Sequence, residues 1–270
     1  FTPKEWIRLG ENLQFIYEKR EGENTLGEAS PWGWAYRMVP YIPAFDIGDA
    51  NGKRGFGGNA VGESGNASSP VADLWRDADD YQQNYKIFGN MFLELKPVEG
   101  LTIRSSYGID YGNFFNKDFT YRTYERSENV GITGFGTGYN YRLTWTWTNT
   151  AAYEKTFGQH VAKVLVGTEA ISYSGDGIGV STNTFDFEDP NFITLNTDQQ
   201  ASPQVSASQP TPEKIASYFG RVDYIFNDKY LFNATIRRDG TSKVFEDERY
   251  GTFPAFGLGW RVSEEGFMSG

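Results

Sequence analysis

His160 is the only histidine among the 270 residues, and the sequence has no cysteine. A metal site or a Ser-His-Asp triad would have to be assembled around this single imidazole, with no thiolate to help. His160 follows Gly158 and Gln159 in a short polar segment, which predicts a solvated turn residue. We therefore expect no catalytic residue, no metal ion and no cofactor.

Paired carboxylates can act as general acid and nucleophile, as they do in glycoside hydrolases. The acidic pairs of this chain are directly adjacent in sequence: Asp79-Asp80, Glu188-Asp189 and Glu264-Glu265. Adjacent side chains of a strand point to opposite faces of the sheet, so such pairs do not converge on one bond. The glycine-rich run from Gly131 to Gly138 lacks the strand-to-helix context of a phosphate cradle. We expect no enzymatic activity.

Three aromatic residues in a long polar segment are the best binding candidates. Trp32, Trp34 and Tyr36 lie two residues apart. Aromatic faces on an exposed loop can stack on sugar rings or anchor a partner protein. The alternative is that these rings pack the loop onto itself. Both interpretations remain open from the sequence.

The composition excludes several classes of protein. The formal net charge is −10 and no cluster of lysine and arginine is present, so the chain lacks the counterion release that drives nucleic-acid binding. Aromatic residues make up 17% of the chain, yet the mean hydropathy is −0.55 and no stretch reaches the ~18–20 apolar residues of a membrane helix. Abundant aromatic residues and glycine with low hydropathy are typical of β-barrels, in which only alternate strand residues meet lipid.

Tyr139 to Glu154 shows this alternation most clearly. Its odd positions are mostly apolar and include Trp145 and Trp147, whereas its even positions are mostly polar. The pattern runs well past the ~5–6 residues of a typical soluble strand. It predicts a strand with lipid on one side and a water-filled lumen on the other.

Eight segments of the sequence fit long strands. They are residues 11–20, 85–96, 101–111, 139–154, 161–173, 217–226, 230–238 and 251–262. Short connections at residues 97–100, 156–160 and 227–229 alternate with long ones at about residues 21–84, 112–138, 174–216 and 239–250. Strict alternation places all long loops at one end, as in an outer-membrane barrel with short periplasmic turns and long extracellular loops.

The long connections differ in character. Ser30 to Met38 is compatible with a short helical turn, and Asp46 to Gly65 is rich in turn-forming residues. Thr197 to Glu213 is polar, contains three prolines and has no periodicity, so we expect it to be the most mobile segment. The sequence starts at Phe1 without a signal peptide and ends at Gly270 just after a strand, which predicts an internal piece of a longer polypeptide.

Residues Ser217 to Met268 resemble the SusC/RagA family of TonB-linked outer-membrane transporters. The resemblance rests on the segments SYFGRV, DKYL, ATIRRDGTS, YGTFPAF and GWRVSEEGFM, in this order and spacing. Residues 36–46, 108–111, 145–150 and 166–170 also resemble the family. The resemblance covers nearly the whole chain.

The resemblance implies that residues 1–270 form part of an all-β, 22-stranded antiparallel transmembrane barrel, with about eight strands here and the plug domain outside this sequence. It further implies TonB-dependent import of oligosaccharides or oligopeptides across the outer membrane of a Gram-negative bacterium. The implied partners are the TonB complex, which acts through the plug, outer-membrane lipid, and a SusD-like surface lipoprotein that caps the barrel as a lid. Trp32, Trp34 and Tyr36 then become candidates for contact with substrate or lid.

Closure of these eight strands on themselves is disfavoured on physical grounds. Small barrels are filled by their own side chains, and the row expected to face the lumen carries bulky cations: Arg104, Arg142, Arg221 and Arg237. We therefore predict that the first and last strands do not pair with each other.

Two other functions fit the residues. A barrel that does no transport, acting as an adhesin or a structural protein, would show the same strands. A secreted β-sandwich that binds or hydrolyses glycans would instead bury Trp145 and Trp147 against a second sheet. The sequence leaves the substrate undetermined.

Overall fold

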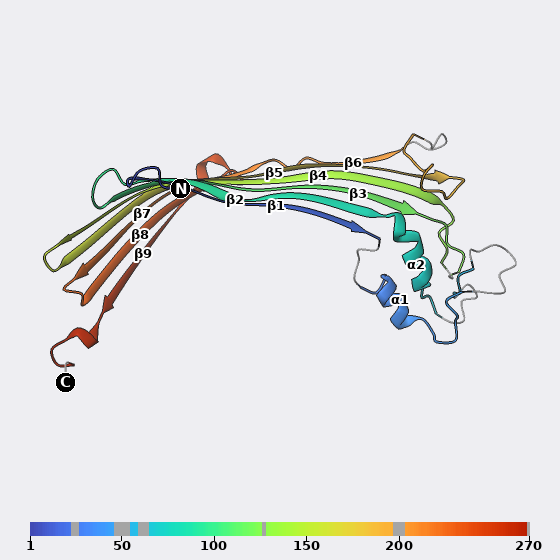
Figure 1. Ribbon diagram of the computed structural model, residues 1–270, viewed down its shortest axis with the longest axis horizontal. Helices are drawn as coiled ribbons and strands as arrows, with labels where there is room; N and C mark the ends of the chain where they lie inside the picture. The colour runs from blue at the N-terminus through green and yellow to red at the C-terminus, as the bar shows by residue number, and fades with distance from the viewer. Residues whose placement is uncertain (23–26, 46–54, 59–64, 126–127, 197–202, 269–270) are drawn as a thin grey trace.

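Alternating side chains along the chain produce one curved antiparallel sheet, seen edge-on as an arch in Figure 1. The structure is a computed structural model and describes residues 1–22, 27–45, 55–58, 65–125, 128–196 and 203–268. In the described residues the sheet has nine strands: β1 (Ile7–Glu21), β2 (Tyr81–Leu95), β3 (Leu101–Thr120), β4 (Thr133–Phe157), β5 (His160–Phe185), β6 (Gln204–Ser208), β7 (Glu213–Phe226), β8 (Tyr230–Thr241) and β9 (Tyr250–Trp260).

The eight predicted strands are confirmed, and they pair in sequence order. The order is β1-β2-β3-β4-β5-β7-β8-β9, and β6 pairs with the far part of β5. Within the described chain β1 pairs only with β2 and β9 only with β8, so the sheet is not closed. The predicted separation of the first and last strands is confirmed.

Several strands continue beyond their predicted ends. β3 runs on to Thr120, and β4 and β5 reach 25 and 26 residues. The turn between β4 and β5 is tight, as Phe157 pairs directly with His160 across Gly158 and Gln159. Gly158 has a φ of 60°, the left-handed conformation that primed hairpin turns require and that glycine adopts without strain.

The long connections lie at the opposite end from these tight turns, as predicted. The β1–β2 connection carries helix α1 (Pro31–Arg37), helix α2 (Pro70–Arg76) and a 3-10 turn, η1 (Asp77–Asp79), and Figure 1 shows both helices hanging below one end of the arch. Two further 3-10 turns are η2 (Glu246–Glu248) and η3 (Val262–Glu264). The prediction of a helical turn within residues 30–38 is confirmed. No helix in the described ranges is long and apolar enough to cross a bilayer.

The segment expected to be the most mobile contains regular structure. Gln204 to Ser208 forms β6, which pairs with Gly177–Ser181 where β5 extends past the start of β7. The expectation of an aperiodic loop was wrong for these five residues because pairing with an exposed strand edge compensates for weak local patterning. The turn-rich segment 46–65 falls mainly outside the described residues.

Fully buried apolar side chains are scarce in the described chain and lie at the long-loop end. Tyr121, Phe135, Phe185 and Ile193 form a cluster between the extended strands and the connections. The middle of the sheet has no second layer packed on it in the described residues. The sandwich alternative is therefore wrong, and Trp147 remains half exposed.

Candidate functional site

The strand register sorts the side chains of the sheet into two faces. Tyr107 lies opposite Trp147 and Ile109 lies opposite Trp145, so both indoles share a face with the apolar residues of β3. The pairing of neighbouring strands continues this face across all eight long strands, and we call it the apolar face. Its apolar residues include Leu13, Phe15, Tyr17, Ile87, Met91, Leu93, Ile103, Tyr107, Ile109, Trp145, Trp147, Val164, Val166, Val222, Tyr224, Phe232, Ile236, Phe256 and Leu258.

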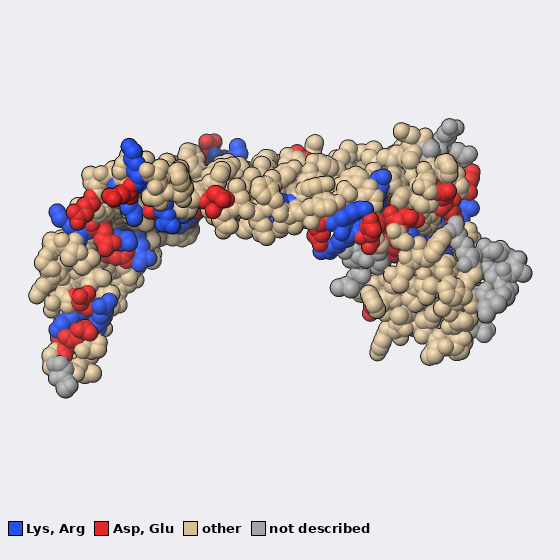
Figure 2. Space-filling model, viewed as in Figure 1, with Lys and Arg blue, Asp and Glu red and all other residues tan. Residues whose placement is uncertain are grey.

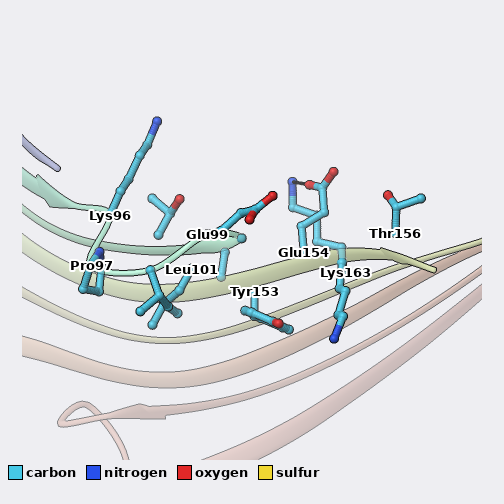
Figure 3. A pocket seen from close by; sticks show the side chains of 13 residues that line it. Lys96, Pro97, Glu99, Leu101, Tyr153, Glu154, Thr156 and Lys163 are labelled. Atoms are coloured by element: carbon cyan, nitrogen blue, oxygen red, sulfur yellow. Dashed lines mark ion pairs between the residues drawn. The ribbon is translucent and has the colours of Figure 1, made fainter. Parts of the chain in front are cut away.

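The opposite side, which we call the charged face, carries most of the ionisable groups of the strands. The register places all four predicted arginines on it: Arg104, Arg142, Arg221 and Arg237. Figure 3 shows the two faces at the tight-turn end, where Leu101 and Tyr153 lie on one side of the sheet and Glu154 and Thr156 on the other. These residues border a cavity of about 1080 Å³, beside which Lys163 and Glu154 form an ion pair of 3.4 Å.

Arg237 is paired with carboxylates both across strands and along its own strand. Arg237 on β8 donates to Glu169 on β5 at 2.8 Å, to Asp239 at 2.7 Å and to Ser217 on β7 at 3.0 Å. Glu169 also accepts a hydrogen bond from Thr148 on β4. The network therefore links four strands and fixes the position of a cation on the wall.

Two units with the same construction lie on the charged face. In the first, the ring of Phe92 lies over Gly10, where an added Cβ would meet the ring at 2.3 Å, and the Arg104 guanidinium stacks 3.9 Å from the ring centroid. In the second, Phe219 lies over Gly167 and Arg237 stands 5.4 Å from its centroid. Glycine thus lets each ring lie flat on the neighbouring strand, where its π-face attracts the cation.

Helix α1 presents two of the three aromatic candidates to solvent. Ser30 caps the helix by accepting from the Gly33 N–H, and Pro31 occupies the first turn, where its missing N–H costs nothing. Trp32 and Tyr36 are 75% and 92% exposed and lie four residues apart, on one side of the helix.

Trp34 belongs to the packing of the loop instead. Its indole is half-buried, and the Arg37 guanidinium lies 4.2 Å from its ring centroid. Packing of the loop therefore accounts for Trp34, whereas a binding role for the exposed Trp32 and Tyr36 stays a prediction.

A buried ion pair joins the β1–β2 connection to the β3–β4 connection. Arg76, the last residue of α2, donates two hydrogen bonds of 2.8 Å to the two carboxylate oxygens of Glu125. The side chains are 5% and 1% exposed. A chain of aromatic contacts runs beside it through Phe45, Phe56, Trp75, Tyr121 and Phe119 to Phe135. Nothing in the local sequence signals this pairing.

The ion pair shifts the pKa of each residue in the direction that favours its charged form. Burial raises the pKa of Glu125, but the hydrogen bonds from Arg76 and from the Tyr124 N–H lower it by more, so the pKa lies below its ordinary value. Burial lowers the pKa of the Arg76 guanidinium, and the contacts with Glu125 raise it by more. Both groups are therefore held ionised.

The other residues considered for chemistry have structural roles. His160 was expected to be solvated, but it is half-buried, with Nδ1 2.6 Å from the Tyr224 hydroxyl and its ring against Phe157 and Phe226. The expectation was wrong because a two-residue turn places His160 inside the strand ladder.

The acidic pairs hold turns together. Asp79 accepts from the Tyr121 hydroxyl, and Asp80 from the Phe119 N–H. Glu265 accepts from Tyr230, Trp260 and Lys229. The glycine-rich run lies largely within β4. No group of three potential metal ligands occurs in the described part of the chain.

Comparison with known proteins gives relatives of one kind. No family model matches the chain. It is 29% identical over 277 residues to TonB-dependent receptor P39 of Formosa agariphila, covering 99% of this chain and 24% of the receptor. TonB-dependent receptor P26 of the same organism is 28% identical over 218 residues, covering 74% of this chain and 20% of the receptor.

TonB-dependent receptor SusC of Bacteroides thetaiotaomicron is 31% identical over 140 residues, which is 51% of this chain and 13% of that protein. The chain thus spans about a quarter or less of the length of these three relatives. Their names agree with the resemblance found in the sequence.

Solved structures show the same fold. The RagAB peptide transporter matches with a TM-score of 0.76 at 19% identity, over 100% of this chain and 30% of that one. The RagAB peptide importer in its closed-closed state gives 0.77 over 99% of this chain and 30% of that one, also at 19% identity. The predicted resemblance is therefore confirmed: the chain is similar in sequence to TonB-dependent receptors of the SusC kind, and its fold is that of a segment of the RagA barrel.

Proposed function

We propose that this chain forms part of the barrel wall of a TonB-dependent outer-membrane importer. The observation that carries the proposal is the continuous apolar face across eight antiparallel strands, which no second layer covers in the described residues. Side chains such as Phe256 and Leu258, 76% and 87% exposed, would be unfavourable in water. A bilayer covers such a face completely.

The charged face lines the aqueous path in this proposal. Arg237 and Arg104 are held by the cross-strand partners Glu169 and Glu94, so these two cations stay fixed on the wall. In Figure 2 charged side chains gather toward the two ends of the arch, and a long central stretch of this view carries few. Such a distribution suits an apolar band flanked by two aqueous regions.

The long-loop end faces the cell exterior in the proposal. Trp32 and Tyr36 are offered there as contacts for the substrate or for a SusD-like surface lipoprotein that closes the barrel. Their exposure on a helix that is capped by Ser30 and braced by Trp34 and Arg37 supports a recognition role, because rigid aromatic anchors lose little entropy on binding. The TonB complex would act through a plug domain outside this sequence.

The substrate is an oligosaccharide or an oligopeptide in this proposal. Stacking on aromatic rings suits sugars, and the solved structures with this fold are described as peptide transporters and importers. The two substrate classes are separated by experiment.

The test removes the full-length gene from its host and measures energy-dependent uptake of labelled oligosaccharides and of labelled oligopeptides by whole cells. We expect loss of uptake for one class, the same loss in a strain without TonB, and restoration by the wild-type gene. Unchanged uptake of both classes, with the protein present in the outer membrane, would instead favour an adhesin or structural barrel.

The loop contacts are tested in the same cells with Trp32→Ala and Tyr36→Ala. We expect both variants to reach the membrane in normal amount and to lower uptake or lipoprotein co-purification several-fold. Phe245→Ala is the control, since this aromatic side chain is 87% exposed in the β8–β9 connection. Equal activity of all three variants would remove the aromatic pair from the proposal.

A further inference from the structure

Arg142 differs from the other three arginines of the charged face because it has no acidic partner among the described residues. Carboxylates neutralise the other three: Glu94 pairs with Arg104, Asp223 with Arg221, and Glu169 and Asp239 with Arg237. The Arg142 side chain is exposed, and within the described chain its guanidinium forms neither an ion pair nor a hydrogen bond. One positive charge is therefore left available at this point of the wall.

Both cross-strand neighbours of Arg142 are glycines. Gly112 on β3 lies opposite it on one side, and Gly175 on β5 lies opposite it on the other. An added Cβ at Gly112 would have nothing within 4 Å, so the space beside the arginine is open. Arg104 and Arg237 each lie against an aromatic ring, whereas the strands on either side of Arg142 present no side chain at its level.

Acidic residues that lie close to Arg142 in the strand register are paired with lysines. The carboxylate of Asp110 on β3 is 3.5 Å from the ammonium group of Lys86. The carboxylate of Glu213 on β7 is 2.6 Å from the ammonium group of Lys243. Because each of these pairs carries no net charge, the charge of Arg142 stays uncompensated in the described part of the sheet.

A cavity of about 740 Å³ adjoins Arg142 where β6 ends and β7 begins. The paired Glu213 and Lys243 border it. Its lining also includes residues that the register places on the charged face: Asn140, Arg142, Tyr173, Ser206 and Ser208. The cavity therefore combines one uncompensated cation with an amide, two hydroxyls and an aromatic ring, a set that suits a polar ligand with one negative group.

The position of Arg142 along β4 puts this cavity toward the long-loop end. Arg142 lies about 15 residues from Phe157, the last residue of β4. About 10 tilted residues cross the hydrocarbon layer in a membrane barrel. In the proposed importer the cavity is therefore on the outer part of the aqueous path, where a substrate arrives first.

We infer that Arg142 and this cavity bind a carboxylate group of the imported substrate. The inference rests on the proposed function, in which the charged face lines the aqueous path. A guanidinium presents a planar fork of N–H donors that matches a carboxylate with two parallel hydrogen bonds. Glycine on both neighbouring strands leaves this fork accessible. The carboxylate belongs to a sugar acid of an oligosaccharide or to an acidic oligopeptide.

Two substitutions remove the available charge in different ways. Arg142→Gln deletes it. Gly112→Asp places a competing carboxylate on the neighbouring strand, where directly opposed Cβ atoms lie ~4.5–5.5 Å apart. Gly112→Asn is the control for the second, since it adds the same bulk without charge. Arg20→Gln is the control for the first, since Arg20 is an exposed arginine on the charged face of β1 that is already bonded to Glu18.

The experiment measures import by cells that carry the full-length receptor. Three labelled pools are offered: uronic-acid oligosaccharides from hydrolysed pectate and alginate, oligopeptides from a peptic digest of casein, and neutral maltodextrins. Each acidic pool is offered as the free acid and as the methyl ester. We expect the wild type to import the free acid of one pool at least tenfold faster than its ester, and that pool identifies the source of the carboxylate.

The variants show whether Arg142 causes this preference. Arg142→Gln and Gly112→Asp should abolish it, whereas Gly112→Asn and Arg20→Gln should keep it. Arg142→Lys should weaken it several-fold, because lysine keeps the charge but lacks the fork. Heat-modifiable gel mobility verifies that each variant is folded in the outer membrane. Equal import of acid and ester by the wild type, or a preference that survives in folded Arg142→Gln, would overturn the inference.

The same cells separate this inference from the proposed function. TonB-dependent import of the neutral maltodextrins alone contradicts the carboxylate site and leaves the proposed function standing. A folded wild-type receptor that gives no TonB-dependent import of any pool contradicts the proposed function and the carboxylate site together.

Discussion

Arg76 and Glu125 are 49 residues apart in sequence and share two hydrogen bonds of 2.8 Å in a nearly solvent-free site. The pair connects two long connections that approach each other only because β2 and β3 are neighbours in the sheet. It ties helix α2 of the β1–β2 connection to the β3–β4 connection. Helix α1 contacts α2, so we expect the placement of Trp32 and Tyr36 to depend on this tie.

We predict that Arg76→Met releases the β1–β2 connection. Removing one partner leaves a buried charge uncompensated, which typically costs about 3–5 kcal/mol. Limited proteolysis of the detergent-solubilised receptor should show faster cleavage within residues 23–80. Lys163→Ala breaks the exposed pair with Glu154 and is the control, since such pairs contribute about 0–1 kcal/mol. Equal cleavage rates for the two variants would contradict the anchoring role.

The same pair predicts a dependence of loop docking on pH. The pKa of Glu125 is lower in the folded protein than in the unfolded chain, where it is about 4.3. The ionised carboxylate therefore stabilises docking fully above that value, and the contribution is lost as the pH falls through the lower, folded pKa. Proteolysis with an acid-active protease between about pH 2 and 6 should show this loss, and Glu125→Gln should remove the pH dependence attributable to this residue.

Neighbouring residues on β4 provide a direct test of the two faces. Trp147 belongs to the apolar face and Thr146 to the charged face. An arginine facing lipid near the bilayer midplane costs about 2–4 kcal/mol, whereas a lumen-facing one is tolerated. Trp147→Arg should sharply reduce the folded receptor in outer membranes, measured by heat-modifiable gel mobility, and Thr146→Arg should not. Loss of the folded receptor for Thr146→Arg and not for Trp147→Arg would mean that the charged face, and not the apolar face, meets the lipid.

Gly89 on β2 occupies a position that only glycine fits without strain, whereas Gly112 on β3 does not. Its φ is +147°, and an added Cβ would lie 1.8 Å from the carbonyl oxygen of Asn12 on β1. Gly112, on β3, has nothing within 4 Å of an added Cβ. Gly89→Ala should therefore destabilise the barrel by at least the ~1–3 kcal/mol of an unfavourable backbone conformation, and Gly112→Ala should be nearly neutral. Urea-induced unfolding in detergent would compare them.

The strands of the sheet could be predicted from the sequence because the two faces of each strand meet different surroundings. Between Tyr139 and Glu154, for example, apolar residues lie mostly on one face and polar residues mostly on the other, so the residue types alone indicate the strand. Past Gly112 the alternation fails, as Phe114 and Phe115 are adjacent, yet β3 continues to Thr120. Where both faces meet similar surroundings, pairing with β4 maintains the strand without a sequence pattern.

The missed features arise from contacts distant in sequence or from short signals. β6 depends on an edge of β5 about 27 residues away. Helix α2 had a local signal, since Ser69 precedes Pro70 and accepts from the Ala72 N–H, but seven residues give little periodicity. Trp32 and Tyr36 could be proposed from residue type alone, whereas only the structure separates them from Trp34.

The lengths of β4 and β5 have a consequence for what the cell displays. At ~3.3 Å per residue, their 25 and 26 residues span roughly 80 Å, whereas about 10 tilted residues cross the ~25 Å hydrocarbon layer. In an inserted receptor of the proposed kind, most of the remainder would stand clear of the lipid as paired strands. Proteases approaching the cell would first meet the long connections at the outer end, and below them only paired strand backbone.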